Sequence, residues 1–330
     1  MLIVDASLAV LSWLGRQGTR AVAALVVIGI ALPSIGAILK PYVTEAVFLL
    51  LCIAFLRVDV TAFKTYIRRP AIVLAATAWT SVAIPVLVGV SGLAFGLDKQ
   101  APELFLALML QAVASPMMAA PTLAALMRLD ATLVLVTLIT STTLIPLTAP
   151  VFALVFVGPN LSISPLALAA KLIAILAGAA LIGFVVRRVF GVAAIERQKE
   201  RINGLNILVL FVFVAAVMES VGARFLASPM TTMALAALAL VVYCVVLCLT
   251  VLLFLFAGRE RALALGFMAS QRNMGLMLAA TGGALPDLTW LYFALSQFPI
   301  YLSPQLLQPL ARRILGRAPH GYAPAQEPKT

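Results

Sequence analysis

A short run of polar residues interrupts an apolar stretch in the last third of the sequence. Ser270, Gln271, Arg272 and Asn273 follow one another inside the segment 261–285. Arg272 is the only charged residue deep within an apolar segment. A central arginine costs about 2.5–3.5 kcal/mol on insertion scales, so this side chain must face a protein interior or a wet cavity. Two interpretations stay open: the guanidinium binds an anionic solute, or it caps backbone carbonyls at the end of a broken helix.

The segment 102–127 carries a second interruption, made by two prolines. Pro116 and Pro121 lie in its middle, and each removes a backbone donor and clashes with the preceding turn. The sequence therefore predicts unwound backbone from Ser115 to Thr122, although a simple kink is the alternative. In the later segment an unwound stretch would also help Ser270, Arg272 and Asn273 to converge, because consecutive helical residues point ~100° apart. Two glycines there allow flexibility and close helix approach, Gly275 and Gly282.

A third polar cluster lies in the segment 130–157. Its five hydroxyl residues precede Pro146 and Pro150, and they are Thr137, Thr140, Ser141, Thr142 and Thr143. Such side chains often bond the carbonyl four residues earlier in their own helix. Their density indicates that some of them line a cavity beside the segment 102–127, and Ser141 and Thr142 are the candidate binding residues among them.

The residues that enzymes need are missing from the apolar segments. The one histidine, His320, lies in a polar tail, and the segments hold no acid pair and no G-x-S-x-G motif. Hydrolysis or group transfer requires a nucleophile with a base, a carboxylate pair or a metal. We therefore expect no enzyme activity, no cofactor and no metal held by histidines.

The composition excludes a soluble domain. Of the 330 residues 63% are hydrophobic and 11% are charged, whereas soluble domains are about half apolar and a quarter charged. Ten apolar segments are long enough to cross a bilayer, and we predict one helix for each: 21–39, 43–58, 70–95, 102–127, 130–157, 164–188, 203–222, 230–256, 261–285 and 288–308.

The basic residues orient these segments. With both termini inside, eighteen of the 23 Lys and Arg residues face the cytoplasm and four face outward, as the positive-inside rule requires. The net charge of +11 is therefore a topology signal, and we expect no nucleic-acid partner. The expected location is the inner (plasma) membrane of a bacterial cell, with cytoplasmic N and C termini.

The ten segments divide into two halves of five. An odd number in each half inverts the second half, which is the arrangement of inverted-repeat transporters with broken helices at the bilayer midplane. We predict an interfacial lead (1–20), a first repeat (21–157), a linker (158–163), a second repeat (164–308) and a disordered cytoplasmic tail (309–330). The broken helices are the fourth and ninth, and we expect them to cross.

Over residues 20–310 the sequence resembles the bile acid:sodium symporter family. Pro116 stands at the start of that family's crossover, and Ser141-Thr142 is followed by Pro146 and Pro150 with the family's spacing. Residues 57–70, RVDVTAFKTYIRRP, are similar to its amphipathic linker. The resemblance implies a secondary transporter of organic anions, with segments one, two, six and seven as a panel that moves against a core of the other six.

The sequence departs from the family where sodium binds. The family motif Glu-x-Gly-x-Gln-Asn, aligned on Asn273, has Met268 for Glu and Arg272 for Gln. The repulsion between unit charges ~4 Å apart is about 4 kcal/mol at an effective dielectric of 20. The resemblance thus implies a degraded sodium site near Thr122, Ser141 and Asn273. Our hypothesis is that Arg272 supplies the positive charge that sodium supplies elsewhere.

These observations favour a transporter of a small organic anion that works by alternating access. Its candidate binding residues are Ser115, Thr122, Ser141, Thr142, Ser270, Gln271, Arg272 and Asn273. The main alternative is an uncoupled efflux permease or facilitator for an anionic or polar solute. A cation/proton antiporter is disfavoured because no acidic residue lies mid-membrane, and a receptor has no positive signal.

Overall fold

The computed structural model describes residues 9–15, 28–29, 31–57, 70–158, 163–283 and 285–316. These residues are almost entirely helical, and no strand is found among them. The elements of the first part of the chain are α3 (Pro33–Leu39), η1 (Lys40–Tyr42), α4 (Val43–Leu56), α6 (Pro70–Ala78), η2 (Trp79–Ala83), α7 (Ile84–Ala94), α8 (Leu97–Gln100), α9 (Pro102–Val113), α10 (Ala120–Leu126), α11 (Ala131–Phe152) and η3 (Ala153–Val157).

The second part of the chain has a similar alternation of long and interrupted helices. Its elements are α12 (Pro165–Phe190), α13 (Val192–Arg197), α14 (Lys199–Met218), α15 (Val221–Ala227), α16 (Pro229–Phe254), η5 (Leu255–Ala257), α17 (Arg259–Ser270), α18 (Met274–Thr281) and α19 (Asp287–Ile314). The short elements η2 and η3 are π-helical turns within longer helices, and η1 and η5 are 3₁₀-helical.

Six helices of the described chain are long and apolar enough to cross a membrane. They are Pro33–Leu56, Pro70–Ala94, Ala131–Val157, Pro165–Phe190, Lys199–Ala227 and Pro229–Ala257. Their outward side chains are large and apolar, for example Leu87 on α7 and Leu252 on α16, as expected of surfaces that face lipid. The predicted all-helical membrane architecture is therefore present, whereas the count of ten spanning segments stays a prediction.

The predicted start of the C-terminal tail differs from the structure. The last helix, α19, continues to Ile314, so the predicted disordered tail is wrong for residues 309–314. Ala311 is buried there in an apolar cluster with Leu265 and Phe267 of α17, and this packing extends the helix. Residues 317–330 of the tail, the linker residues 159–162, residues 58–69, and most of 1–30 lie outside the described residues.

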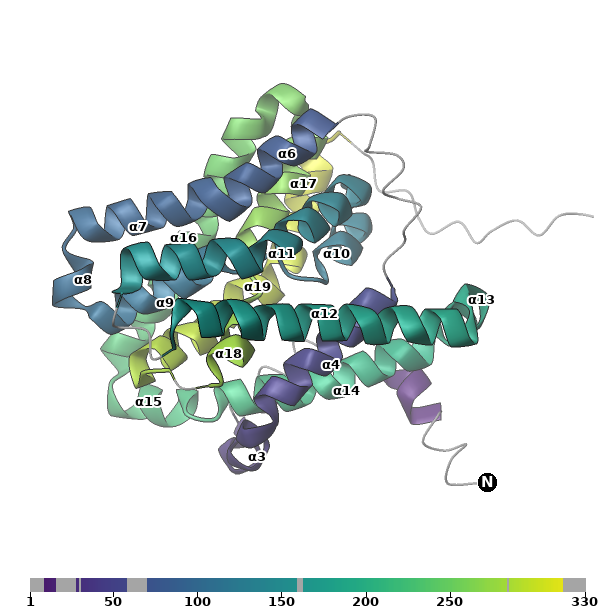
Figure 1. Ribbon diagram of the computed structural model, residues 1–330, viewed down its shortest axis with the longest axis horizontal. Coiled ribbons are helices and arrows are strands. Elements are labelled where there is room, and N and C mark those ends of the chain that lie inside the picture. Colours follow the sequence, from purple (N-terminus) through teal and green to yellow (C-terminus); the bar gives the residue numbers. More distant parts are fainter. Residues whose placement is uncertain are drawn as a thin grey trace, which may run out of the picture.

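The helices pack as two groups (Figure 1). α4 lies between α12 and α14, and α3 lies against α14. α6, α10, α11 and α17 pack together in the other group, and α16 packs on α17 and α19. Gly183 of α12 permits the close approach to α4, because a Cβ atom there would lie 3.0 Å from the backbone of Leu56. The first group consists of the predicted segments that the family resemblance assigns to a panel.

Candidate functional site

The two interrupted helices meet at their interruptions. α9 ends at Val113 and α17 ends at Ser270, and their second halves begin at Ala120 and Met274. Between these ends, Pro116 and Arg272 form an isolated antiparallel bridge. The predicted interruption of each segment is confirmed, and the unwound strands lie against each other.

Two backbone hydrogen bonds hold this crossing together. The Met117 amide donates to the Gln271 carbonyl over 2.7 Å, and the Asn273 amide donates to the Ser115 carbonyl over 2.7 Å. Buried backbone groups that leave a helix need new partners. The two unwound segments supply these partners to each other, which explains how both interruptions persist inside an apolar protein.

The first interruption is shorter than the sequence suggested. Ala120, Pro121 and Thr122 already belong to α10, and Pro121 lies in its first turn. A proline there removes no intrahelical hydrogen bond, because the first amides of a helix have no partner in any case. Pro121 therefore starts the second half-helix rather than prolonging the break, and Thr122 is exposed on α10.

Asn273 and the two glycines shape α18. The Asn273 side chain accepts a hydrogen bond from the Leu276 amide at 3.3 Å and so caps the helix. Gly275 lies where a Cβ atom would be 3.2–3.3 Å from Phe213 of α14 and Val47 of α4. Gly282 ends the helix with φ +71°, a conformation that glycine adopts without steric cost. Asn273 and Gly282 therefore set the two ends of α18, and Gly275 lets it pack closely against α4 and α14.

Arg272 is buried at the crossing, with 4% of its surface exposed. Its Nη1 atom donates to the Ala114 carbonyl over 2.9 Å and to the Thr80 carbonyl over 3.2 Å. Ala114 follows the last residue of α9, so its carbonyl is one that the broken helix leaves free. The guanidinium thus caps a half-helix, as one of the two interpretations predicted.

The other side of the same guanidinium is unsatisfied. The Nε and Nη2 atoms of Arg272 are buried and have no hydrogen-bond partner. Within the described chain no carboxylate lies within ion-pair distance of Arg272. A buried charge of this kind is costly unless it is paired, so a buried cation remains without a counterion.

The side chains of Gln271 and Ser270 bond partners outside the two unwound segments. The Gln271 Nε2 atom donates to Ser303 Oγ over 2.6 Å and lies 3.3 Å from both Tyr243 Oη and the Ile300 carbonyl. Ser270 donates to the Phe267 carbonyl of its own helix over 2.9 Å. Gln271 therefore fastens the crossover to α16 and α19 by its amide nitrogen.

The hydroxyl cluster on α11 contains side chains that bond carbonyls of their own helix and side chains that do not. Thr140 and Thr143 bond carbonyls of their own helix over 3.0 and 2.9 Å. Three other hydroxyls of α11 and that of Ser115 are buried without a partner: Thr137, Ser141 and Thr142. Buried polar groups without a partner are uncommon in proteins and require an explanation.

Sequence reasoning missed the contribution of η2. This π-helical turn in the helix Pro70–Ala94 brings the Thr80 carbonyl to Arg272, and the Trp79 indole nitrogen donates to Thr250 Oγ1 of α16 over 2.8 Å. π-Helical turns often occur at functional sites. Nothing in the residues 79–83 signals the turn, because its neighbours lie in the distant helices α11 and α16.

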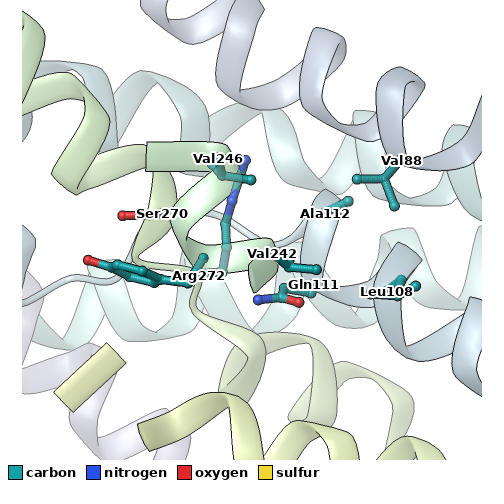
Figure 2. A pocket seen from close by; sticks show the side chains of 9 residues that line it. Val88, Leu108, Gln111, Ala112, Val242, Val246, Ser270 and Arg272 are labelled. Carbon is teal, nitrogen blue, oxygen red and sulfur yellow. The ribbon is translucent and has the colours of Figure 1, made fainter. Parts of the chain in front are cut away.

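A small cavity of about 10 Å³ adjoins the crossover. Figure 2 shows the nitrogen end of Arg272 beside Val246 of α16. The lining is apolar except at four residues, and the full set is Val88, Leu108, Gln111, Ala112, Val242, Tyr243, Val246, Ser270 and Arg272. The described residues hold no group of three His, Cys, Asp or Glu side chains that could bind a metal ion.

These features define the class of protein. An all-helical membrane protein in which two interrupted helices cross is built as a secondary transporter.

The chain belongs to the sodium bile acid symporter family, whose model matches residues 44–229. The matched region is more than half of the chain and includes the first interruption and α11. Members of this family are membrane transporters and not enzymes. A search of curated proteins finds no match to the chain.

Proposed function

We propose that this protein is a secondary transporter that moves a small organic anion by alternating access. Its membership of the family and the crossing of α9–α10 with α17–α18 support this function. The proposed topology has ten spanning segments in two inverted repeats of five. The distribution of basic residues supports cytoplasmic termini, and the proposed location is a bacterial inner membrane.

We place the solute at the crossover. The buried hydroxyls of Ser115, Ser141 and Thr142 have no partner within the described chain, and polar groups of a solute would satisfy them. Thr122 is exposed on α10 and Asn273 is half-buried at the start of α18, so both are available for contact. Arg272 contributes a fixed positive charge at the crossing, which favours an anion over a cation.

The proposed transport is not coupled to sodium. A sodium ion requires oxygen ligands, and the Ala114 carbonyl, which the broken helix leaves free, already accepts from Arg272 over 2.9 Å. Met268, which replaces the glutamate of the family motif, has no oxygen and is fully buried. The residues present therefore do not fit a sodium ion at this position. In this proposal Arg272 is a tethered cation that takes the place of the ion.

Transport in proteoliposomes tests this function. Uptake of a panel of small organic anions is measured with an imposed sodium gradient and with an equal potassium gradient, for the native protein and Arg272→Gln. We expect equal uptake under both gradients for the native protein. The variant should lose at least tenfold in uptake of the preferred anion. Undiminished uptake by the variant, or uptake that requires sodium in the native protein, would contradict the proposal.

A further inference from the structure

The free edge of Arg272 has the geometry of a carboxylate site. Nη1 is occupied by the two carbonyls, whereas Nε and Nη2 are buried and unpaired. These two nitrogens carry parallel N–H groups along one side of the planar guanidinium. Such a fork matches the two oxygens of a carboxylate in a bidentate pair. A single spherical anion cannot align with both N–H groups as well as the two oxygens of a carboxylate can.

The cavity beside Arg272 is a small crevice bordered by residues that reach the apolar surface of the protein. Arg272 is the only charged residue in its lining, and the walls come from α7, α9 and α16 (Figure 2). Val88, Val242 and Val246 at the wall are half-buried, so each keeps part of its surface accessible. Their neighbours Val90 and Val245 are 55% and 48% exposed. In a membrane protein these surfaces face acyl chains.

The crevice is separate from the helix surfaces that would move against each other. No residue of α3, α4, α12 or α14 lines it. The opposite side of the crossover, at Gly275, contacts α4 and α14. A ligand in the crevice would therefore reach Arg272 from the lipid side and not from the interface between the two groups of helices.

We propose that this crevice binds the carboxylate of a single-chain aliphatic acid that enters from the bilayer. The carboxylate would pair with Nε and Nη2 of Arg272 and compensate the buried charge, and the chain would lie between α7 and α16. The cavity of about 10 Å³ holds about one water molecule. Binding thus requires the side chains of Val242 and Val246 to rotate outward.

The proposal is tested with decanoate, given as its potassium salt. The full chain is placed in nanodiscs of phosphatidylcholine, and the binding of radiolabelled decanoate and the melting temperature are measured. Decanol, which has the same chain without charge, and potassium bromide serve as parallel ligands. We expect saturable decanoate binding that raises the melting temperature, and no comparable effect of decanol or bromide.

Two variants of α16 separate the crevice from the rest of the surface. Val246→Trp fills the crevice and leaves Arg272 in place, so decanoate affinity should fall at least tenfold. Val245→Trp adds the same ring to the adjacent lipid-facing position and should leave the affinity unchanged. Equal affinity in both variants would overturn the proposal. Stabilisation by bromide as strong as that by decanoate would also overturn it, since it would indicate a halide site.

Decanoate binding in the crevice and the proposed transport function can be disproved independently of each other. Arg272→Gln should abolish decanoate binding, but Val246→Trp is the decisive variant because it keeps the crossover intact. If Val246→Trp still moves the transported anion while it no longer binds decanoate, the crevice is a site distinct from the transport pathway. If it loses both activities together while its fold is retained, the crevice belongs to the transport pathway and the inference of a separate site is wrong.

Discussion

Sodium binding should become measurable when Arg272 is removed and the family's ligands are restored. The perturbation is the double variant Met268→Glu with Arg272→Gln, which places a carboxylate and an amide at the two positions of the family motif. A hard cation that shared the Ala114 carbonyl at ~2.4 Å would lie about 4 Å from Arg272 Nη1, which is 2.9 Å from the same oxygen. Removing the guanidinium removes the repulsion at this separation.

The size of the effect follows from Coulomb's law. Two unit charges 4 Å apart repel by about 4 kcal/mol at an effective dielectric of 20, which weakens sodium binding about a thousandfold. With a dissociation constant of ~10 mM in the double variant, 200 mM sodium stabilises the folded state by about 1.8 kcal/mol. The corresponding constant of ~10 M in the native protein gives a negligible effect.

The assay is thermal unfolding in 200 mM sodium chloride and in 200 mM choline chloride. The double variant should melt about 3 °C higher in sodium, although the buried carboxylate that replaces the Met268 side chain lowers its stability in both salts. The native protein should melt at the same temperature in both. Arg259→Gln is the control, because this exposed arginine begins the same helix and its removal should create no sodium response. Sodium stabilisation of the native protein equal to that of the double variant would refute the reasoning.

Three further predictions concern the residues that hold the crossover, and each is measured as the free energy of unfolding. Asn273→Ala should lose about 1 kcal/mol because it removes the cap of α18, whereas Asn273→Asp retains an acceptor and should lose less; equal losses would show that the cap is not the cause. Gln271→Leu should lose about 1 kcal/mol, since it removes the 2.6 Å hydrogen bond to the buried hydroxyl of Ser303, which keeps its bond to the Ile300 carbonyl, and a neutral result would mean that this bond adds nothing. Gly282→Ala should cost about 1 kcal/mol because φ is +71° there, so a stabilised variant would contradict the argument from backbone geometry.

The interruptions could be predicted because they conflict with their surroundings. Prolines and a charge inside apolar segments have few physical solutions, and an unwound backbone is one of them. The length of the first break could not be predicted, because Pro121 is as compatible with the first turn of a helix as with a loop. Only the packing of α10 on α11 and α17 decides between these two placements.

The partners of the polar residues were also beyond the sequence. Gln271 and Arg272 are adjacent, yet the first bonds α16 and α19 and the second bonds carbonyls at Thr80 and Ala114. Likewise Thr140 bonds its own helix while Ser141 stays unpaired. Side chains one residue apart face different neighbours, and the identity of those neighbours depends on the arrangement of distant segments.

The sequence by itself determined that this is an all-helical membrane protein with two interrupted segments. Contact with lipid restricts the spanning segments to apolar residues, so the few polar residues and prolines inside them can be recognised. The sequence also determined that Arg272 must lie inside the protein. Only the tertiary structure decided what Arg272 does there. One nitrogen caps the broken α9, and the other two remain unpaired. That division depends on where residues 192 and 158 positions away in the sequence are placed, and no local rule of composition or spacing specifies it.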